Sequence, residues 1–558
     1  MGQGLSFILL IAAALAVTAL IGHRDRKAAE EKAVTALKEG FGKAGSKSYP
    51  DGRKSKIDRY FLKHPARFSL DDITWNDLDM DAVYERIDRT CSAAGEEYLY
   101  RMLRCPSTDG TGIPHKEKIE WWTDHEEERI RAQRALQDLG SMGKYSIYDY
   151  LDALDDLEDR PLYKDLYALI LPAAALVAMA FYPGPGLILF LLALVFNIVQ
   201  YFRVKAKIDP YLQSFRYILR LNRCAKDLGG IDMPLCKEEK ERLREGSDAM
   251  ASFSRGSGIL MRSGSGTASA NPFGLIWDYL CILFHFDLMK YGSMLRQVRG
   301  CGDQIDAMIT AIGSIDTQIS ISSFSVSLPH HCVPDLRKGA FDGHGMYHPL
   351  LEDPVPSDIH ADRPVLITGS NASGKSTFLK TTALCALLAQ TIGVVPAAQY
   401  SAPAYRIYTS MALRDDLRGG ESYFLVEIRS LKRVLDAAQA EEESPVLCCV
   451  DEVLRGTNTL ERISASTEIL KVLAQEHVQV FAATHDLELT DLLADSYDNY
   501  HFSEEMEGED VRFSYQLLPG SADSRNAIKL LRRLGYDASI ADRAQERADH
   551  FLETGEWQ

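Results

Sequence analysis

The chain has 558 residues, enough for about two to four domains of ordinary size, so a single compact unit is not expected. Its formal net charge of -17 at pH 7 argues against a protein coated in positive potential. Nucleic-acid binding is therefore less expected but not excluded, because a local basic groove can still hold phosphates. The ten cysteines show neither a disulfide framework nor the spacing of a zinc site.

The first element is an apolar segment, Leu5 to Ile21, with an uncharged start and a basic flank that includes Arg24. A secretory signal peptide carries its positive charge before the apolar stretch, whereas here the charge follows it. This order predicts a membrane anchor over residues 1–23 with its C-terminal flank in the cytoplasm. Residues 24–69 have few apolar positions and are interpreted as a solvated helix or a loose linker.

Helical apolar spacing begins at residue 70, with a break expected at Ala93-Ala94-Gly95. Two longer apolar runs follow, Leu166 to Tyr182 and Leu187 to Phe202, joined by a Pro-Gly-Pro-Gly turn that predicts a helical hairpin. Each run is at the short end of the about 17–25 residues that cross a bilayer, so a hairpin buried in a protein core is an alternative. Basic flanks and an uncharged turn favour a transmembrane hairpin with both ends in the cytoplasm.

The stretch from Arg203 to Arg223 is basic with interleaved aromatic residues. It could contact phosphates of DNA or of lipid headgroups, and an ordinary solvated helix face beside a membrane is the alternative. Taken together, the apolar segments predict a multi-pass protein of the cell membrane with its catalytic part in the cytoplasm.

From residue 323 the pattern changes to alternating strands, turns and helices, as in an α/β nucleotide-binding domain. Its strongest motif is GSNASGKS at 369–376, which follows an apolar strand and matches GxxxxGK[ST]. In such a loop, backbone N–H groups wrap the phosphates of ATP, Lys375 reaches the β- and γ-phosphates, and the Ser376 hydroxyl binds Mg²⁺. The predicted nucleotide-binding residues are Gly369, Ser370, Asn371, Ala372, Ser373, Gly374, Lys375, Ser376 and Thr377.

Two further strands are predicted to end at the same site. The run from Pro445 to Val450 ends in Asp451 and Glu452. Alone this would be an exposed strand end, but together with the loop it predicts that Asp451 orients Mg²⁺ and Glu452 polarises the attacking water. The strand ending in Thr484 is followed by His485, predicted to hydrogen-bond the γ-phosphate or the water as a neutral imidazole, with a structural histidine as the alternative. Lys375, Glu452 and His485 are the predicted catalytic residues.

These motifs occur in the order and spacing of MutS ATPase domains, which the chain resembles. The similarity includes Asp451-Glu452 with Arg455-Gly456-Thr457-Asn458-Thr459, and the segment Ser422-Tyr423-Phe424. The resemblance implies an α-helical core or lever domain plus a C-terminal α/β P-loop ATPase domain of the ABC type, with transmembrane helices added in this chain. It also implies ATP and Mg²⁺ as ligands and a homodimer in which Ser422 acts at the partner's ATP site. The helical domain would then act as a lever that transmits nucleotide-driven changes of the dimer.

The resemblance is incomplete, because the region before residue 70 has no Phe-x-Glu wedge for mismatches and little chain follows the ATPase region. The leading hypothesis is a membrane-anchored MutS-like ATPase with ATP-dependent binding of DNA, coupled to switching of the dimer, with mismatched or branched DNA as candidate substrates. The alternative is a membrane-associated, ATP-driven conformational machine or scaffold that does not bind DNA. The predicted order is an anchor (1–23), a linker (24–69), the helical core or lever domain (70–163 and 204–322) interrupted by the hairpin (164–203), the ATPase domain (323–545) and a tail (546–558).

Overall fold

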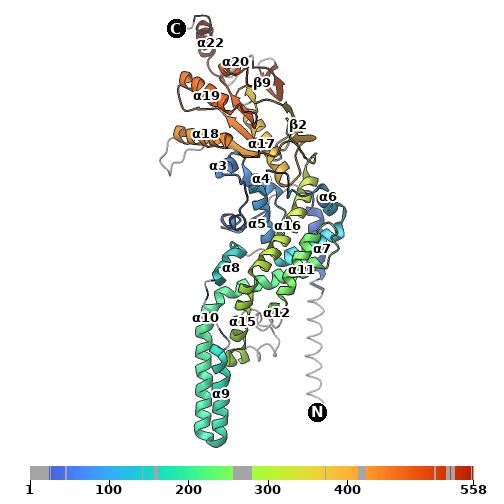
Figure 1. The fold of residues 1–558 in the computed structure, drawn as a ribbon, viewed down its shortest axis with the longest axis vertical. Helices are drawn as coiled ribbons and strands as arrows, with labels where there is room; N and C mark the ends of the chain where they lie inside the picture. The colour runs from blue at the N-terminus through green and yellow to red at the C-terminus, as the bar shows by residue number, and fades with distance from the viewer. Residues whose placement is uncertain are drawn as a thin grey trace.

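The computed structural model describes residues 24–25, 27–43, 47–140, 143–155, 157, 161, 163–254, 279–370, 373–411, 423–440, 442–507, 510–522, 528, 535–554 and 556. The molecule is elongated, with an α/β domain at one end, a two-helix hairpin at the other and a body of helices between them (Figure 1). The predicted helical region followed by a C-terminal α/β domain is therefore confirmed. The predicted anchor, 1–23, lies outside the described residues.

The helical body forms around α16 (Gly302–Ser327), which is buried along most of its length and packs against α5, α6 and α11. The helix α5 (Ala93–Arg104) begins at the predicted break, because the Ser92 side chain caps it by accepting a hydrogen bond from the Gly95 N–H at 3.1 Å. The other helices of the body are α2 (Arg59–Lys63), α3 (Asp72–Asp77), α4 (Met80–Ile87), α6 (Lys116–Asp124), α7 (Glu126–Leu139), α8 (Ile147–Asp155), α11 (Lys237–Ala249), α12 (Ala251–Ser254) and α15 (Phe286–Gly300).

The predicted linker is wrong over its second half, which is part of the helical body. Arg53 is fully buried and donates to Glu96 at 2.7 Å and to Glu97 at 3.0 Å on α5. Tyr60 is also buried, and its hydroxyl lies 2.8 Å from that of Thr310 on α16. Sequence periodicity could not find these contacts, because each joins residues that are far apart in the chain.

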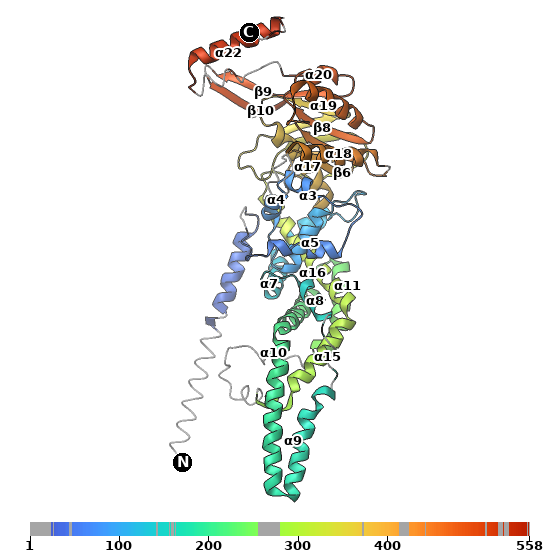
Figure 2. The same cartoon turned by 90° about the vertical axis from the view of Figure 1, so that its left-hand side faces the viewer.

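The predicted hairpin is formed by α9 (Tyr163–Phe181) and α10 (Pro183–Gly229), which project from the body side by side (Figures 1 and 2). Among the described residues, two helices are long and apolar enough to cross a membrane, Tyr163–Phe181 and Pro183–Ile208. Only 22% and 11% of their apolar windows are buried, so the core-hairpin alternative does not fit. The predicted boundary at 203 is wrong, because α10 continues unbroken into the body.

A buried polar group fastens the base of the hairpin to the segment before α15. The Asn197 side-chain amide on α10 donates to the carbonyls of Ala168 at 2.9 Å and Leu283 at 2.8 Å, and the main-chain carbonyl of Asn197 lies 3.0 Å from His285 Nε2. Because unsatisfied polar groups are costly in an apolar setting, these bonds fix the rotation of both hairpin helices.

The α/β domain contains two sheets. The larger has the order β10-β9-β4-β8-β7-β6, with every neighbouring pair parallel except β10 and β9. The smaller has the order β1-β5-β2-β3. The strands are β1 (Asp335–Leu336), β2 (Phe341–Met346), β3 (Ser357–Ala361), β4 (Val365–Thr368), β5 (Gln399–Ala402), β6 (Arg406–Ser410), β7 (Val446–Asp451), β8 (Val478–Thr484), β9 (Asp498–Glu507) and β10 (Asp510–Pro519).

In the larger sheet, the parallel strands β4, β6, β7 and β8 are buried on both faces, as a parallel sheet requires. Cys449 of β7 packs into the core that contains α17 (Lys375–Thr391), whereas Cys448 packs toward α18 (Tyr423–Gln439) and α19 (Thr459–Leu473). The remaining helices are α20 (Glu488–Leu492) and α22 (Ala538–Thr554). The predicted domain limits at 322/323 and 545/546 are wrong, because they cut through α16 and α22.

Polar contacts join the helical body to the α/β domain. Asp77 of α3 accepts hydrogen bonds from Thr409 Oγ1 at 2.7 Å and from the Met411 N–H at 3.0 Å, at the end of β6. Lys380 of α17 pairs with Asp79 at 2.6 Å, just before α4. The body is thus bonded both to a strand end of the larger sheet and to the helix that follows β4.

Candidate functional site

The predicted site residues follow neighbouring strands of the larger sheet. Thr368 of β4 pairs with Thr484 of β8, and Asp451 of β7 pairs with Ala483 of β8. The parallel register therefore places the ends of these three strands at one edge, where ligands bind in open α/β sheets. The segments that follow β4, β7 and β8 meet there, as the sequence predicted.

The loop after β4 has the strand before it and the helix after it that the motif predicts. Its glycines are needed, because Gly369 and Gly374 have φ of 145° and 106°. Lys375 is 3% exposed, and its ammonium donates to the carbonyls of Gly369 at 2.6 Å and Ser370 at 2.7 Å. The Ser370 hydroxyl is buried and has no hydrogen-bond partner among the described residues. Of the predicted loop residues, Asn371 and Ala372 lie outside the described part, and Ser373 and Thr377 frame the first turn of α17.

The two predicted Mg²⁺ residues are in contact. The Ser376 hydroxyl donates to the Asp451 carboxylate across the gap between α17 and β7. Burial raises the pKa of Asp451, and the bond from Ser376 opposes that rise. A hydroxyl and a carboxylate beside a phosphate loop are oxygen donors of the kind that Mg²⁺ prefers, so this pair fits the ion.

The predicted catalytic pair is also in contact. Glu452 Oε1 lies 3.1 Å from His485 Nδ1, and the Glu452 N–H donates to the Ala483 carbonyl at 2.9 Å. The hydrogen bond from His485 lowers the pKa of Glu452, and the same bond raises the pKa of His485. The carboxylate partner thus shifts His485 toward imidazolium, which is opposite to the direction that the predicted neutral imidazole needs.

This pair gives a prediction that needs no substrate. We expect Glu452→Gln to lower the pKa of His485 toward its ordinary value of 6.5, because the anionic partner is lost. Diethyl pyrocarbonate reacts with neutral imidazole, so peptide mass spectrometry of labelled protein across pH 6–9 reports this titration. In the native protein, His485 keeps its proton at pH values below its raised pKa and loses it as the pH rises through that value. Equal labelling profiles in the two proteins would contradict the pairing.

A pocket of about 340 Å³ opens beside the loop. Gly374 and Thr377 form one wall, and the rest includes His348, Phe502 and Tyr515. Burial lowers the pKa of His348 to about 4, so this imidazole is neutral. No motif assigned these side chains to a pocket, since they come from segments far apart in the chain.

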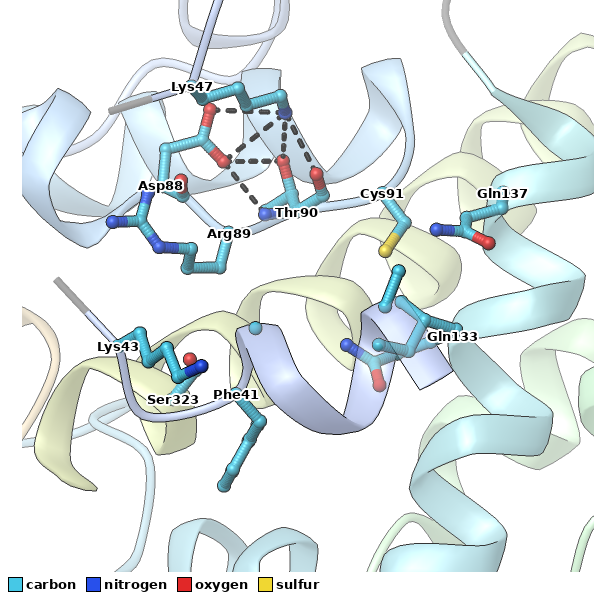
Figure 3. Close-up of a pocket in the computed structure, with 13 residues that line it drawn as sticks. Phe41, Lys43, Lys47, Asp88, Arg89, Thr90, Cys91, Gln133, Gln137 and Ser323 are labelled. Carbon is cyan, nitrogen blue, oxygen red and sulfur yellow. Dashed lines mark hydrogen bonds and ion pairs between the residues drawn. The ribbon is translucent and has the colours of Figure 1, made fainter. Parts of the chain in front are cut away.

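A second cavity, of about 580 Å³, lies away from this sheet edge, between the helix of residues 27–40 and the helical body (Figure 3). Lys47 in its wall is already paired with Asp88 at 3.3 Å and Glu96 at 2.9 Å (Figure 3 shows the bond to Asp88). Its cation is therefore neutralised by the protein itself, and we assign this cavity no ligand.

Comparison with known proteins identifies the domain that holds the strand edge. Residues 365–552 match the family model of MutS domain V. Residues 365–552 therefore form a domain of the MutS family. The match contains the loop, Asp451, Glu452 and His485. The predicted trans-acting residue of this MutS domain, Ser422, lies outside the described residues.

Curated relatives agree with this assignment. The DNA mismatch repair protein MutS of Natronomonas pharaonis is 30% identical over 268 residues, which are 46% of this chain and 31% of that protein. The protein of the same name from Thermus thermophilus is 38% identical over 203 residues, covering 36% and 24%. That of Thermotoga petrophila is 35% identical over 238 residues, covering 41% and 30%. The chain thus matches less than a third of the length of these relatives.

Proposed function

We propose that this chain binds ATP with Mg²⁺ at the shared strand edge and hydrolyses it. The observation that carries the proposal is the meeting of Lys375, the Ser376–Asp451 pair and the Glu452–His485 pair at that edge. Lys375 would bind the phosphates, and Ser376 and Asp451 would hold Mg²⁺, which neutralises phosphate charge. Glu452 would accept the proton of the attacking water, with His485 orienting the carboxylate.

The pocket beside Gly374 gives the proposed nucleotide a place for its base. It contains a neutral imidazole and the aromatic rings of Phe502 and Tyr515, which offer faces for stacking. A purine between these rings would have its phosphates at the first turn of α17. The dipole of that helix favours anionic phosphates.

Removing the loop lysine tests nucleotide binding. We expect Lys375→Ala to weaken ATP binding about 10- to 150-fold, because a charged hydrogen bond contributes about 1.5–3 kcal/mol. Equilibrium binding of a fluorescent ATP analogue to the detergent-solubilised chain measures this. Lys432→Ala, on the exposed face of α18, is the matched control and should bind normally. Equal affinities of the wild-type chain and both variants for the ATP analogue would contradict the proposed nucleotide site.

We also propose that the chain is a multi-pass membrane protein. The hairpin of α9 and α10 would lie in a lipid bilayer, and the ATPase domain would lie in the cytoplasm. No charged residue occurs from Leu166 to Phe202, and the large apolar side chains there are mostly exposed. The 19 residues of α9 extend about 28 Å, close to the hydrocarbon thickness of a bilayer. A surface without cations cannot neutralise DNA phosphates, so at this end the geometry favours lipid.

Binding of DNA is the second candidate function. It is supported by the relatives, which are named DNA mismatch repair proteins, and by the basic stretch from Arg203 to Arg223. A homodimer, which the family resemblance implies, would carry two such stretches. Turnover of ATP with homoduplex, mismatched and branched DNA at two salt concentrations decides between the candidates. Salt-sensitive stimulation supports DNA binding, and indifference to DNA supports a membrane machine or scaffold.

A further inference from the structure

The loop that carries Glu452 has an unusual backbone. Glu452 and Leu454 have φ of 57° and 59°, in the left-handed region that side chains other than glycine rarely occupy. Such conformations persist where neighbouring groups hold them in place. The question is therefore which groups hold the loop of residues 452–456.

One group that holds the loop lies on α18, the helix that begins directly after the predicted trans-acting residue Ser422. Glu427 on α18 is 3% exposed, and its Oε1 accepts a hydrogen bond from the Arg455 N–H at 3.0 Å. Burial raises the pKa of Glu427, while the N–H groups of Arg455, Leu454 and Gly456 lower it. The carboxylate thus faces three consecutive backbone donors of the loop.

A second contact from the same helix fixes the end of the loop. A side chain at Gly456 would place its Cβ 3.3 Å from the Phe424 ring, so the glycine lets α18 approach closely. The side chain of Arg455 points back toward the reacting group, with Nε 3.2 Å from Glu452 Oε2. The first turns of α18 therefore contact the loop immediately after Glu452.

We propose that Glu427 is a positioning residue, which holds the loop of residues 452–456 against α18 and thereby places Glu452 for hydrolysis. The inference rests on the proposed ATPase function. Because Glu427 bonds the loop to α18, a shift of that helix would change the position of Glu452. A partner subunit that contacts the start of α18 would then control hydrolysis through Glu427 rather than through ATP binding.

The test separates turnover from binding in the full-length chain. We expect Glu427→Ala to lower kcat about 10- to 100-fold with little change in the KM for ATP, since a misplaced reacting group loses about this much. Glu427→Gln keeps one acceptor oxygen and nearly the same shape, so it should fold and show an intermediate loss. The matched control is Asp436→Ala, which removes an exposed carboxylate of the same helix and should turn over normally.

A double-mutant comparison distinguishes positioning from a general structural role. In a Glu452→Gln background, Glu427→Ala should cause no further loss of turnover, because the group it positions is already inactive. A full additional loss of turnover in the Glu452→Gln background would overturn the inference. If Glu427→Ala fails to fold, a normal kcat in Glu427→Gln would overturn it as well. Normal kcat in Glu427→Ala beside an active wild-type chain overturns this inference alone. A wild-type chain that does not hydrolyse ATP overturns the proposed function and the inference with it.

Discussion

Glu452→Gln should bind ATP with near-native affinity and hydrolyse it about 10²- to 10⁴-fold more slowly, because an amide cannot accept the proton of the attacking water. Glutamine keeps the shape of the side chain and an oxygen that can accept from His485, so the fold and the nucleotide contacts should survive. Single-turnover hydrolysis of radiolabelled ATP measures the rate, and filter binding measures retention of the nucleotide.

The matched control is Glu443→Gln, at a carboxylate that is 86% exposed and pairs with Arg67. It should hydrolyse ATP at the native rate. If Glu452→Gln also hydrolyses at that rate, the carboxylate at the end of β7 is not the general base. Loss of ATP binding in Glu452→Gln would instead assign this residue to holding the nucleotide.

The second large effect concerns the hairpin. We expect a chain shortened to residues 24–558 to float with phospholipid vesicles, and Ile170→Arg with Leu192→Arg together to abolish flotation. These side chains are 59% and 60% exposed near the middle of α9 and of the apolar part of α10. An arginine at the bilayer centre costs about 2.5–3.5 kcal/mol, and two such charges oppose insertion of the whole hairpin.

Removing residues 1–23 is necessary in this experiment, because an N-terminal anchor would hold the chain on the vesicles whatever the hairpin does. Leu62→Arg with Val472→Arg adds the same charge at exposed apolar positions outside the hairpin. That control should float like the parent chain. A parent chain that stays in solution without detergent would show that the hairpin meets something other than lipid.

The residues of the candidate site could be chosen from the sequence because they lie in short local motifs. A phosphate loop requires a strand before it and a helix after it, and parallel strands bring Asp451 and His485 to the same edge. Glu427 carries no such motif, since its partners are backbone N–H groups 28 residues away in the chain. The protonation of His485 likewise depends on a neighbour that only the folded chain supplies.

The boundary between the helical and α/β parts was misplaced for a different reason. The segment after Ile319 alternates apolar residues with serine, which is the pattern of a half-buried strand. In the structure it is the last part of α16, where Ser320 donates to the Ile87 carbonyl at 2.8 Å and Ser322 to the Ile119 carbonyl at 2.9 Å. Small hydroxyl side chains that bond neighbouring backbone allow a polar helix face to be buried.

In the proposed bilayer arrangement, the course of α10 sets the orientation of the molecule relative to the membrane. Its 47 residues extend about 70 Å, and the helix changes direction where it leaves the hairpin (Figures 1 and 2). With the hairpin upright in the proposed bilayer, this bend would tilt the helical body and hold the proposed ATP site away from the headgroups.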